Sequence, residues 1–123
     1  MVEDIPLSYE ERKEKISLLR GTKFESLIID SHNQNKFGKP RHGLTPDKIK
    51  EIYNQFDKIK DVFKRPFNSG FRYCFLYRLN KNQSYYLIIM LDERPMVLFN
   101  AYPVGKNIDK RLFKKYLGTF SKR

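Results

Sequence analysis

Residues that bind metals are scarce in this sequence. The 123 residues include one cysteine, Cys74, and two histidines, His32 and His42. A single cysteine excludes an internal disulfide, and these three side chains are too few for the ligand set of a metal cluster. We therefore expect no metal site and no cofactor, and we expect Cys74 to pack as a small apolar side chain in a strand.

Three other signatures are missing. No run of about 18 apolar residues exists, so a membrane span is not expected. The N-terminal stretch MVEDIPLSYEERKEK lacks the basic and apolar blocks of a signal peptide. No glycine-rich turn leads from a strand into a helix, which excludes the common phosphate loops and dinucleotide-binding motifs.

Positive charge, by contrast, is abundant. Lysine and arginine total 25 against 14 aspartates and glutamates, so the formal net charge is +11. Such an excess favours an anionic partner. Nucleic acid ranks first and an acidic protein second, whereas a membrane surface ranks low because no helix joins a basic face to a broad apolar one. A cationic surface without a specific ligand is the alternative interpretation.

The hydrophobic pattern predicts an α+β fold. A first helix is expected from Ser8 to Gly21, and a longer one from Thr45 to Pro66 with Thr45 as its N-cap. Alternating apolar residues and short turns indicate three consecutive antiparallel strands, and a short strand precedes the long helix. The predicted strands are Lys23–Asp30, Phe71–Leu79, Ser84–Leu91 and Met96–Tyr102, and the final helix is Asn107–Leu117.

These segments predict one domain over residues 1–123, with a core at about residues 23–117. We expect a small antiparallel β-sheet of about four strands in a meander, with the helices packed on one face.

The chemistry that remains without a metal is the cleavage of RNA by its own 2′-hydroxyl. That reaction needs a base near the 2′-hydroxyl, an acid near the leaving 5′-oxygen, and cations around the phosphate. Suitable side chains occur in four groups: His32, Arg41 and His42 before the long helix, Arg72 and Arg78 on one strand face, Asn100 and Tyr102 at the end of the last strand, and Lys106, Lys110 and Lys114 beyond it. Each group also has a structural interpretation, as a loop contact, a solvent-facing strand, a turn anchor or a solvated helix face.

Two segments resemble a known group of proteins. KPRHGLTPDKIKEIYNQF is similar to the Lys/Arg-His-Gly segment before a helix in BrnT-like toxins, and RPMVLFNAYPVG looks like the last core strand of EndoU-type toxin domains. The chain thus resembles the small RNase toxins of the barnase–EndoU–colicin–RelE (BECR) superfamily. The resemblance implies that His42 is a catalytic acid or base and that Asn100, in place of the expected threonine, and Tyr102 line the scissile phosphate. It also implies that Arg72 or Arg78 contacts phosphate.

The resulting hypothesis is a metal-independent endoribonuclease toxin that leaves a 2′,3′-cyclic phosphate, with tRNA as one candidate target. His42 is expected to be the general acid or base, with Tyr102 or His32 as its partner. The residues expected to bind RNA are Lys39, Arg41, Lys106, Lys110, Arg111 and Lys114. The expected partner is an acidic antitoxin or immunity protein. The expected site of action is the cytoplasm, and delivery as the C-terminal domain of a secreted effector is one route to it.

Two rival functions stay open. One is a basic module that binds nucleic acid without chemistry, such as a phage or plasmid factor, which predicts salt-sensitive binding and no cleavage. The other is a protein that binds an acidic protein partner, which predicts no affinity for RNA at low salt.

Overall fold

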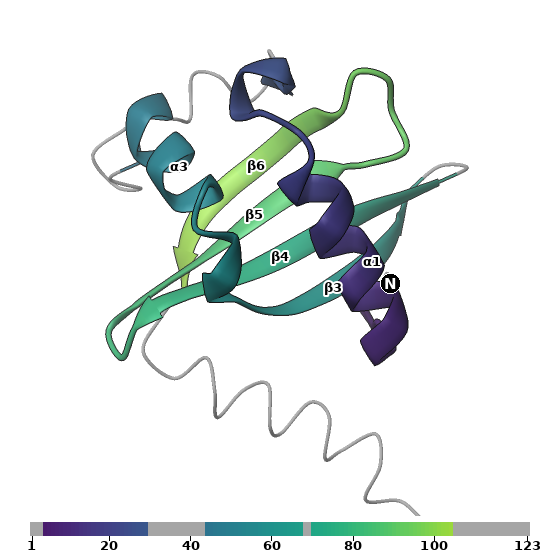
Figure 1. Ribbon diagram of the computed structural model, residues 1–123, viewed down its shortest axis with the longest axis horizontal. Helices are drawn as coiled ribbons and strands as arrows, with labels where there is room; N and C mark the ends of the chain where they lie inside the picture. The colour runs from purple at the N-terminus through teal and green to yellow at the C-terminus, as the bar shows by residue number, and fades with distance from the viewer. Residues whose placement is uncertain (1–3, 30–43, 68–69, 105–123) are drawn as a thin grey trace, which may run out of the picture.

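A computed structural model describes residues 4–29, 44–67 and 70–104, which form a twisted β-sheet with two helices (Figure 1). The sheet has six strands in the order β1-β3-β4-β5-β6-β2. In chain order the elements are β1 (Ile5–Pro6), α1 (Tyr9–Arg20), the 3₁₀ turn η1 (Phe24–Ser26), β2 (Ile28–Ile29), α3 (Pro46–Tyr53), the 3₁₀ turn η2 (Phe56–Lys58), β3 (Ile59–Phe67), β4 (Gly70–Asn80), β5 (Gln83–Met90) and β6 (Val97–Val104). The α+β class expected from the sequence is therefore confirmed.

Both helices begin where their caps predict. The Ser8 hydroxyl accepts the backbone N–H of Glu11 at 3.1 Å, and α1 ends before Gly21. The Thr45 hydroxyl accepts the backbone N–H of Lys48 at 3.2 Å, and Pro46 occupies the first turn of α3. Each hydroxyl satisfies a backbone donor that has no partner within the helix.

The predicted length of the second helix is wrong. α3 ends at Tyr53, and the chain then forms the nine-residue strand β3. The prediction failed because Ile59 and Phe63 continue the helical spacing of the apolar residues before them, and this segment shows no regular strand alternation. In the structure a β-bulge between Ile59 and Asp61 puts Ile59 and Phe63 on opposite faces of the sheet.

The predicted sheet is also incomplete. The antiparallel meander β4-β5-β6 is present, but β3 joins it as a fourth long strand and β1 pairs antiparallel with β3. β2 pairs parallel with β6, so the sheet is mixed and the expectation of a four-stranded antiparallel sheet is wrong. The strand predicted at Lys23–Asp30 is shorter than expected: Phe24–Ser26 form the turn η1, and the strand β2 has two described residues, Ile28–Ile29. β1 also has two residues, too few to show a strand period in the sequence.

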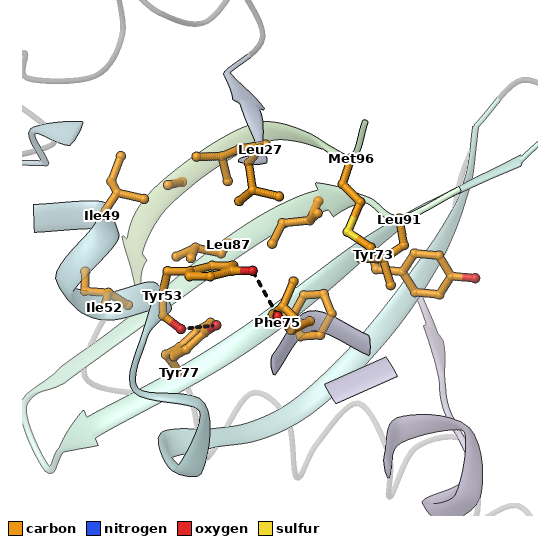
Figure 2. Packing of buried hydrophobic residues seen from close by; sticks show 14 of the residues in the cluster. Leu27, Ile49, Ile52, Tyr53, Tyr73, Phe75, Tyr77, Leu87, Leu91 and Met96 are labelled. Carbon is orange, nitrogen blue, oxygen red and sulfur yellow. Dashed lines mark hydrogen bonds between the residues drawn. The ribbon is translucent and has the colours of Figure 1, made fainter. Parts of the chain in front are cut away.

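The sheet has two different faces. α1 and α3 both lie over the first face, where the main core forms between the helices and the sheet (Figures 1 and 2). The second face carries a smaller cluster of buried side chains, all from strands: Phe63, Cys74, Leu76 and Ile88. Cys74 is buried in this cluster, as the sequence predicts for a small apolar side chain.

Two buried tyrosines join the helices to the first face. The Tyr53 hydroxyl donates to the carbonyls of Leu19 at 3.0 Å and Thr22 at 2.6 Å, at the C-terminal end of α1. The Tyr77 hydroxyl on β4 donates to the carbonyl of Tyr53 at 3.0 Å (Figure 2). Burial raises the pKa of both phenols, so they stay protonated and able to donate. This chain of hydrogen bonds links α1, α3 and the middle of the sheet.

We expect Tyr77→Phe to lower the free energy of unfolding by about 1–3 kcal/mol, because the buried carbonyl of Tyr53 loses its donor while the ring still fills its place. Urea denaturation at neutral pH measures the loss. Tyr9→Phe is the matched control, since Tyr9 is 61% exposed and its variant should differ by less than about 0.5 kcal/mol. Equal stability of Tyr77→Phe and the wild type would contradict a structural role for this hydrogen bond.

Candidate functional site

Four of the predicted site residues lie on the second face of the sheet. Arg72 and Arg78 alternate with Cys74 and Leu76 along β4, and the two apolar residues belong to the cluster on that face. The register places Asn100 of β6 opposite Ile88 and Tyr102 opposite Tyr86, both on β5. Residues that are 22 or more positions apart in the chain, such as Arg78 and Asn100, thus share one surface.

The other predicted residues lie outside the described residues. These are His32, Lys39, Arg41 and His42 before α3, and Lys106, Lys110, Arg111 and Lys114 after β6. Their roles stay predictions, as does the expected final helix from Asn107 to Leu117.

Tyr102 stands beside a second tyrosine on this face. Its ring meets that of Tyr86 edge to face, with 5.6 Å between the centroids. Burial is the main cause that raises the pKa of the Tyr102 phenol, and nearby Cys74 adds to the rise while Arg65 opposes it. At neutral pH the phenol is therefore protonated, which suits a proton donor and not a base.

Asn100 has a backbone partner. Its side-chain oxygen accepts the backbone N–H of Ala101 at 2.9 Å. That bond orients the amide, whose NH₂ group is then the part suited to donate to a ligand oxygen. The expected role of Asn100 in orienting a phosphate is compatible with this arrangement, through donation only.

Arg72 is stacked between two aromatic rings. Its guanidinium carbon lies 3.5 Å from the centroid of Phe67 and 3.7 Å from that of Phe99. We call these three side chains the arginine clamp. Sequence reasoning missed both phenylalanines: Phe67 was placed beyond the predicted helix, and the side-chain direction of Phe99 depends on a β-bulge between β5 and β6.

A second arginine lies beside the clamp. Arg65 of β3 is the register partner of Arg72, and its Nε donates to a carboxylate oxygen of Asp4 at 2.7 Å. This ion pair raises the pKa of Arg65, chiefly through the hydrogen bond with Asp4. One of the two neighbouring positive charges is therefore partly neutralised, which reduces the repulsion between them.

Arg72 and Arg78 do not lie close together. They are six residues apart on β4. At about 3.3 Å per residue their backbones are separated by about 20 Å. The two arginines therefore cannot contact the same phosphate, and only Arg72 is stacked against a residue next to Asn100.

Among the described residues, no group of three or more His, Cys, Asp or Glu side chains gathers in a way that would hold a metal ion. In the same part of the chain, no helix is both long and apolar enough to cross a membrane. Comparisons with protein-family models, with curated proteins and with solved structures find no match to this chain. The resemblance to RNase toxins therefore rests on the two sequence segments alone.

We expect the phenol of Tyr102 to ionise above the ordinary tyrosine pKa of about 10. Phenolate absorbance measured across an alkaline titration tests this, with Tyr102→Phe subtracted from the wild type. The midpoint of the difference should lie above that of an ordinary tyrosine, and a midpoint below it would contradict the burial of this side chain.

Proposed function

We propose that this protein is a metal-independent endoribonuclease of the RNase-toxin type, which binds RNA across the second face of the sheet. The observation that carries the proposal is that Arg72, Arg78, Asn100 and Tyr102 share one face of the sheet, in a chain with a net charge of +11. A cation, an amide donor and a protonated phenol are the groups that a metal-free phosphoryl transfer needs beside a base.

In the proposed reaction one residue acts as the general base and another as the general acid. His42 accepts the proton of the 2′-hydroxyl, whose oxygen attacks the phosphorus. The bond from phosphorus to the 5′-oxygen breaks, and Tyr102 donates its proton to that oxygen, with His32 as the alternative donor. The products are a 2′,3′-cyclic phosphate and a free 5′-hydroxyl. The raised pKa of Tyr102 supports the acid role, because the phenol keeps its proton until the leaving group needs it.

The cations hold the substrate and stabilise the charge of the transition state. The two arginines are proposed to contact different phosphates of the RNA, because the register places Arg72 nearer to Asn100 and Arg78 nearer to Tyr102. The lysines and arginines outside the described residues extend the same positive field. The proposed target is cytoplasmic RNA such as tRNA, and the proposed inhibitor is an acidic antitoxin or immunity protein.

The first test is incubation of the purified protein with total tRNA and ribosomal RNA in EDTA. We expect discrete fragments that end in 2′,3′-cyclic phosphate. His42→Ala and Tyr102→Phe should each lower the cleavage rate by about 10²–10⁴-fold, the usual contribution of a general acid or base. Tyr85→Phe is the matched control, because Tyr85 packs against the core of the first face. Full activity of the His42→Ala, Tyr102→Phe double variant would refute the assignment.

The pH dependence of cleavage separates the two roles. The rate should rise with pH as the proposed base His42 loses its proton, and should not fall again below the range in which an ordinary tyrosine ionises, because the pKa of Tyr102 is raised by burial. Single-turnover rates between pH 5 and 10 measure this profile. A descending limb near neutrality would remove Tyr102 as the acid and favour His32.

A second candidate function is RNA binding without cleavage. Four half-buried aromatic side chains on or beside the second face favour it, because such rings can stack unpaired bases: Phe67, Tyr86, Phe99 and Tyr102. Intact RNA in the EDTA assay, together with a gel shift that salt abolishes, would establish this function in place of the enzyme.

A further inference from the structure

The arginine clamp lies where the sheet narrows to two strands. Toward the start of β4, the last residue that pairs with β5 among the described residues is Tyr73, opposite Ile89. Toward the end of β3, the last residue that pairs with β1 is Lys64, opposite Ile5. Within the described part of the chain, residues 65–67 and 70–72 pair only with each other and form a two-stranded ribbon. Phe67 and Arg72 belong to this ribbon, whereas Phe99 comes from β6, so the clamp connects the ribbon to the far side of the sheet.

The geometry of the clamp restricts one side chain. The centroids of Phe67 and Phe99 lie 6.5 Å apart with an angle of 45° between the rings, and the guanidinium of Arg72 occupies the space between them. The negative face of each ring attracts the cation. A free arginine side chain loses much rotational freedom when it binds a ligand, and here the two rings have already removed that freedom.

A stacked guanidinium also limits which ligands it can take. Its N–H groups lie in its own plane, whose two faces are covered by rings, and its Nε is buried. A ligand is therefore expected to meet the terminal N–H groups, which in one plane match two oxygens of a phosphate, as an ammonium group cannot do. The charge of neighbouring Arg65 is partly neutralised by Asp4.

We propose that Phe67, Arg72 and Phe99 form a phosphate-binding subsite, in which the two phenyl rings are positioning residues that hold the Arg72 guanidinium for a phosphodiester of RNA. The choice of RNA as the ligand rests on the proposed function. The subsite itself rests on the stacking distances and does not require that the RNA is cleaved.

The experiment uses an RNA oligonucleotide with every 2′-hydroxyl methylated, so that it binds but cannot react. Fluorescence anisotropy gives the Kd at several salt concentrations. Arg72→Ala should weaken binding about tenfold and reduce the slope of log K against log salt by about 0.7, the value for one phosphate contact to a single strand. Arg72→Lys keeps the positive charge, so the slope of log K against log salt should equal that of the wild type, whereas most of the loss in affinity for the RNA should remain.

A double-mutant cycle tests the positioning role. Phe99→Leu should weaken binding several-fold in the wild-type background and have no further effect in the Arg72→Ala background. Phe99→Tyr, which keeps the ring, should restore binding. Phe71→Leu is the matched control, because Phe71 lies on the same ribbon but packs against the core of the first face and under Lys64. Thermal melting of each variant confirms that the fold is kept.

Several results would overturn the subsite. An equal loss on Phe99→Leu in both backgrounds would mean that the ring contacts RNA directly as a stacking surface. Unchanged binding by Arg72→Ala would remove the arginine from the interface. Arg72-dependent affinity that inorganic phosphate lowers no more than chloride of the same ionic strength would mean that Arg72 contacts another part of the RNA than a phosphate.

The failure of this inference differs from a failure of the proposed enzyme. If the methylated RNA binds through Arg72 while natural RNA stays intact in EDTA, the subsite stands and the nuclease does not. If natural RNA is cleaved at the wild-type rate by Arg72→Ala, the nuclease stands and the subsite does not.

Discussion

The register of β4 is the constraint on which both faces of the molecule depend. Tyr73, Phe75 and Tyr77 point into the helix-covered core, and the alternate residues form the second face. A slip of one residue would move every side chain of the strand to the opposite face. Arg72 and Arg78 would then lie under α1 and α3, where burial of unpaired charges is prohibitively unfavourable. The same alternation therefore stabilises the fold and presents the arginines.

A helix or strand could be predicted from the sequence only where its hydrophobic pattern repeats over enough residues. α1 follows from Ser8 and Gly21, and β4 follows from nine alternating residues, so both were predicted correctly. β1 is too short to carry a period, and of the strand predicted at Lys23–Asp30 only Ile28–Ile29 form β2 among the described residues. β3 was mistaken for helix because its apolar residues continue the spacing of α3 while a β-bulge breaks its own alternation, and only pairing with β4 shows that it is a strand.

Some features of the candidate site could likewise be predicted from the sequence, and others could not. Alternation in β4 was enough to predict that Arg72 and Arg78 share a face, and the rise of a strand implies that about 20 Å separates the two, too far for a common phosphate. The stacking of Phe99 on Arg72 could not be predicted, because it depends on one extra residue in β6 between two register pairs. The raised pKa of Tyr102 likewise comes from burial among residues of other strands, which no local pattern records.

The outer side of β6 has a consequence for how another protein can bind. β2 covers β6 only at Val97 and Leu98. Farther along, Pro103 has no N–H, and the N–H of Ala101, two residues earlier and so on the same side of the strand, is already held by Asn100. A strand added to this edge would find too few donors for a regular ladder. A peptide laid along this part of β6 would therefore gain few backbone hydrogen bonds, so its recognition there would depend on side chains, which encode sequence specificity.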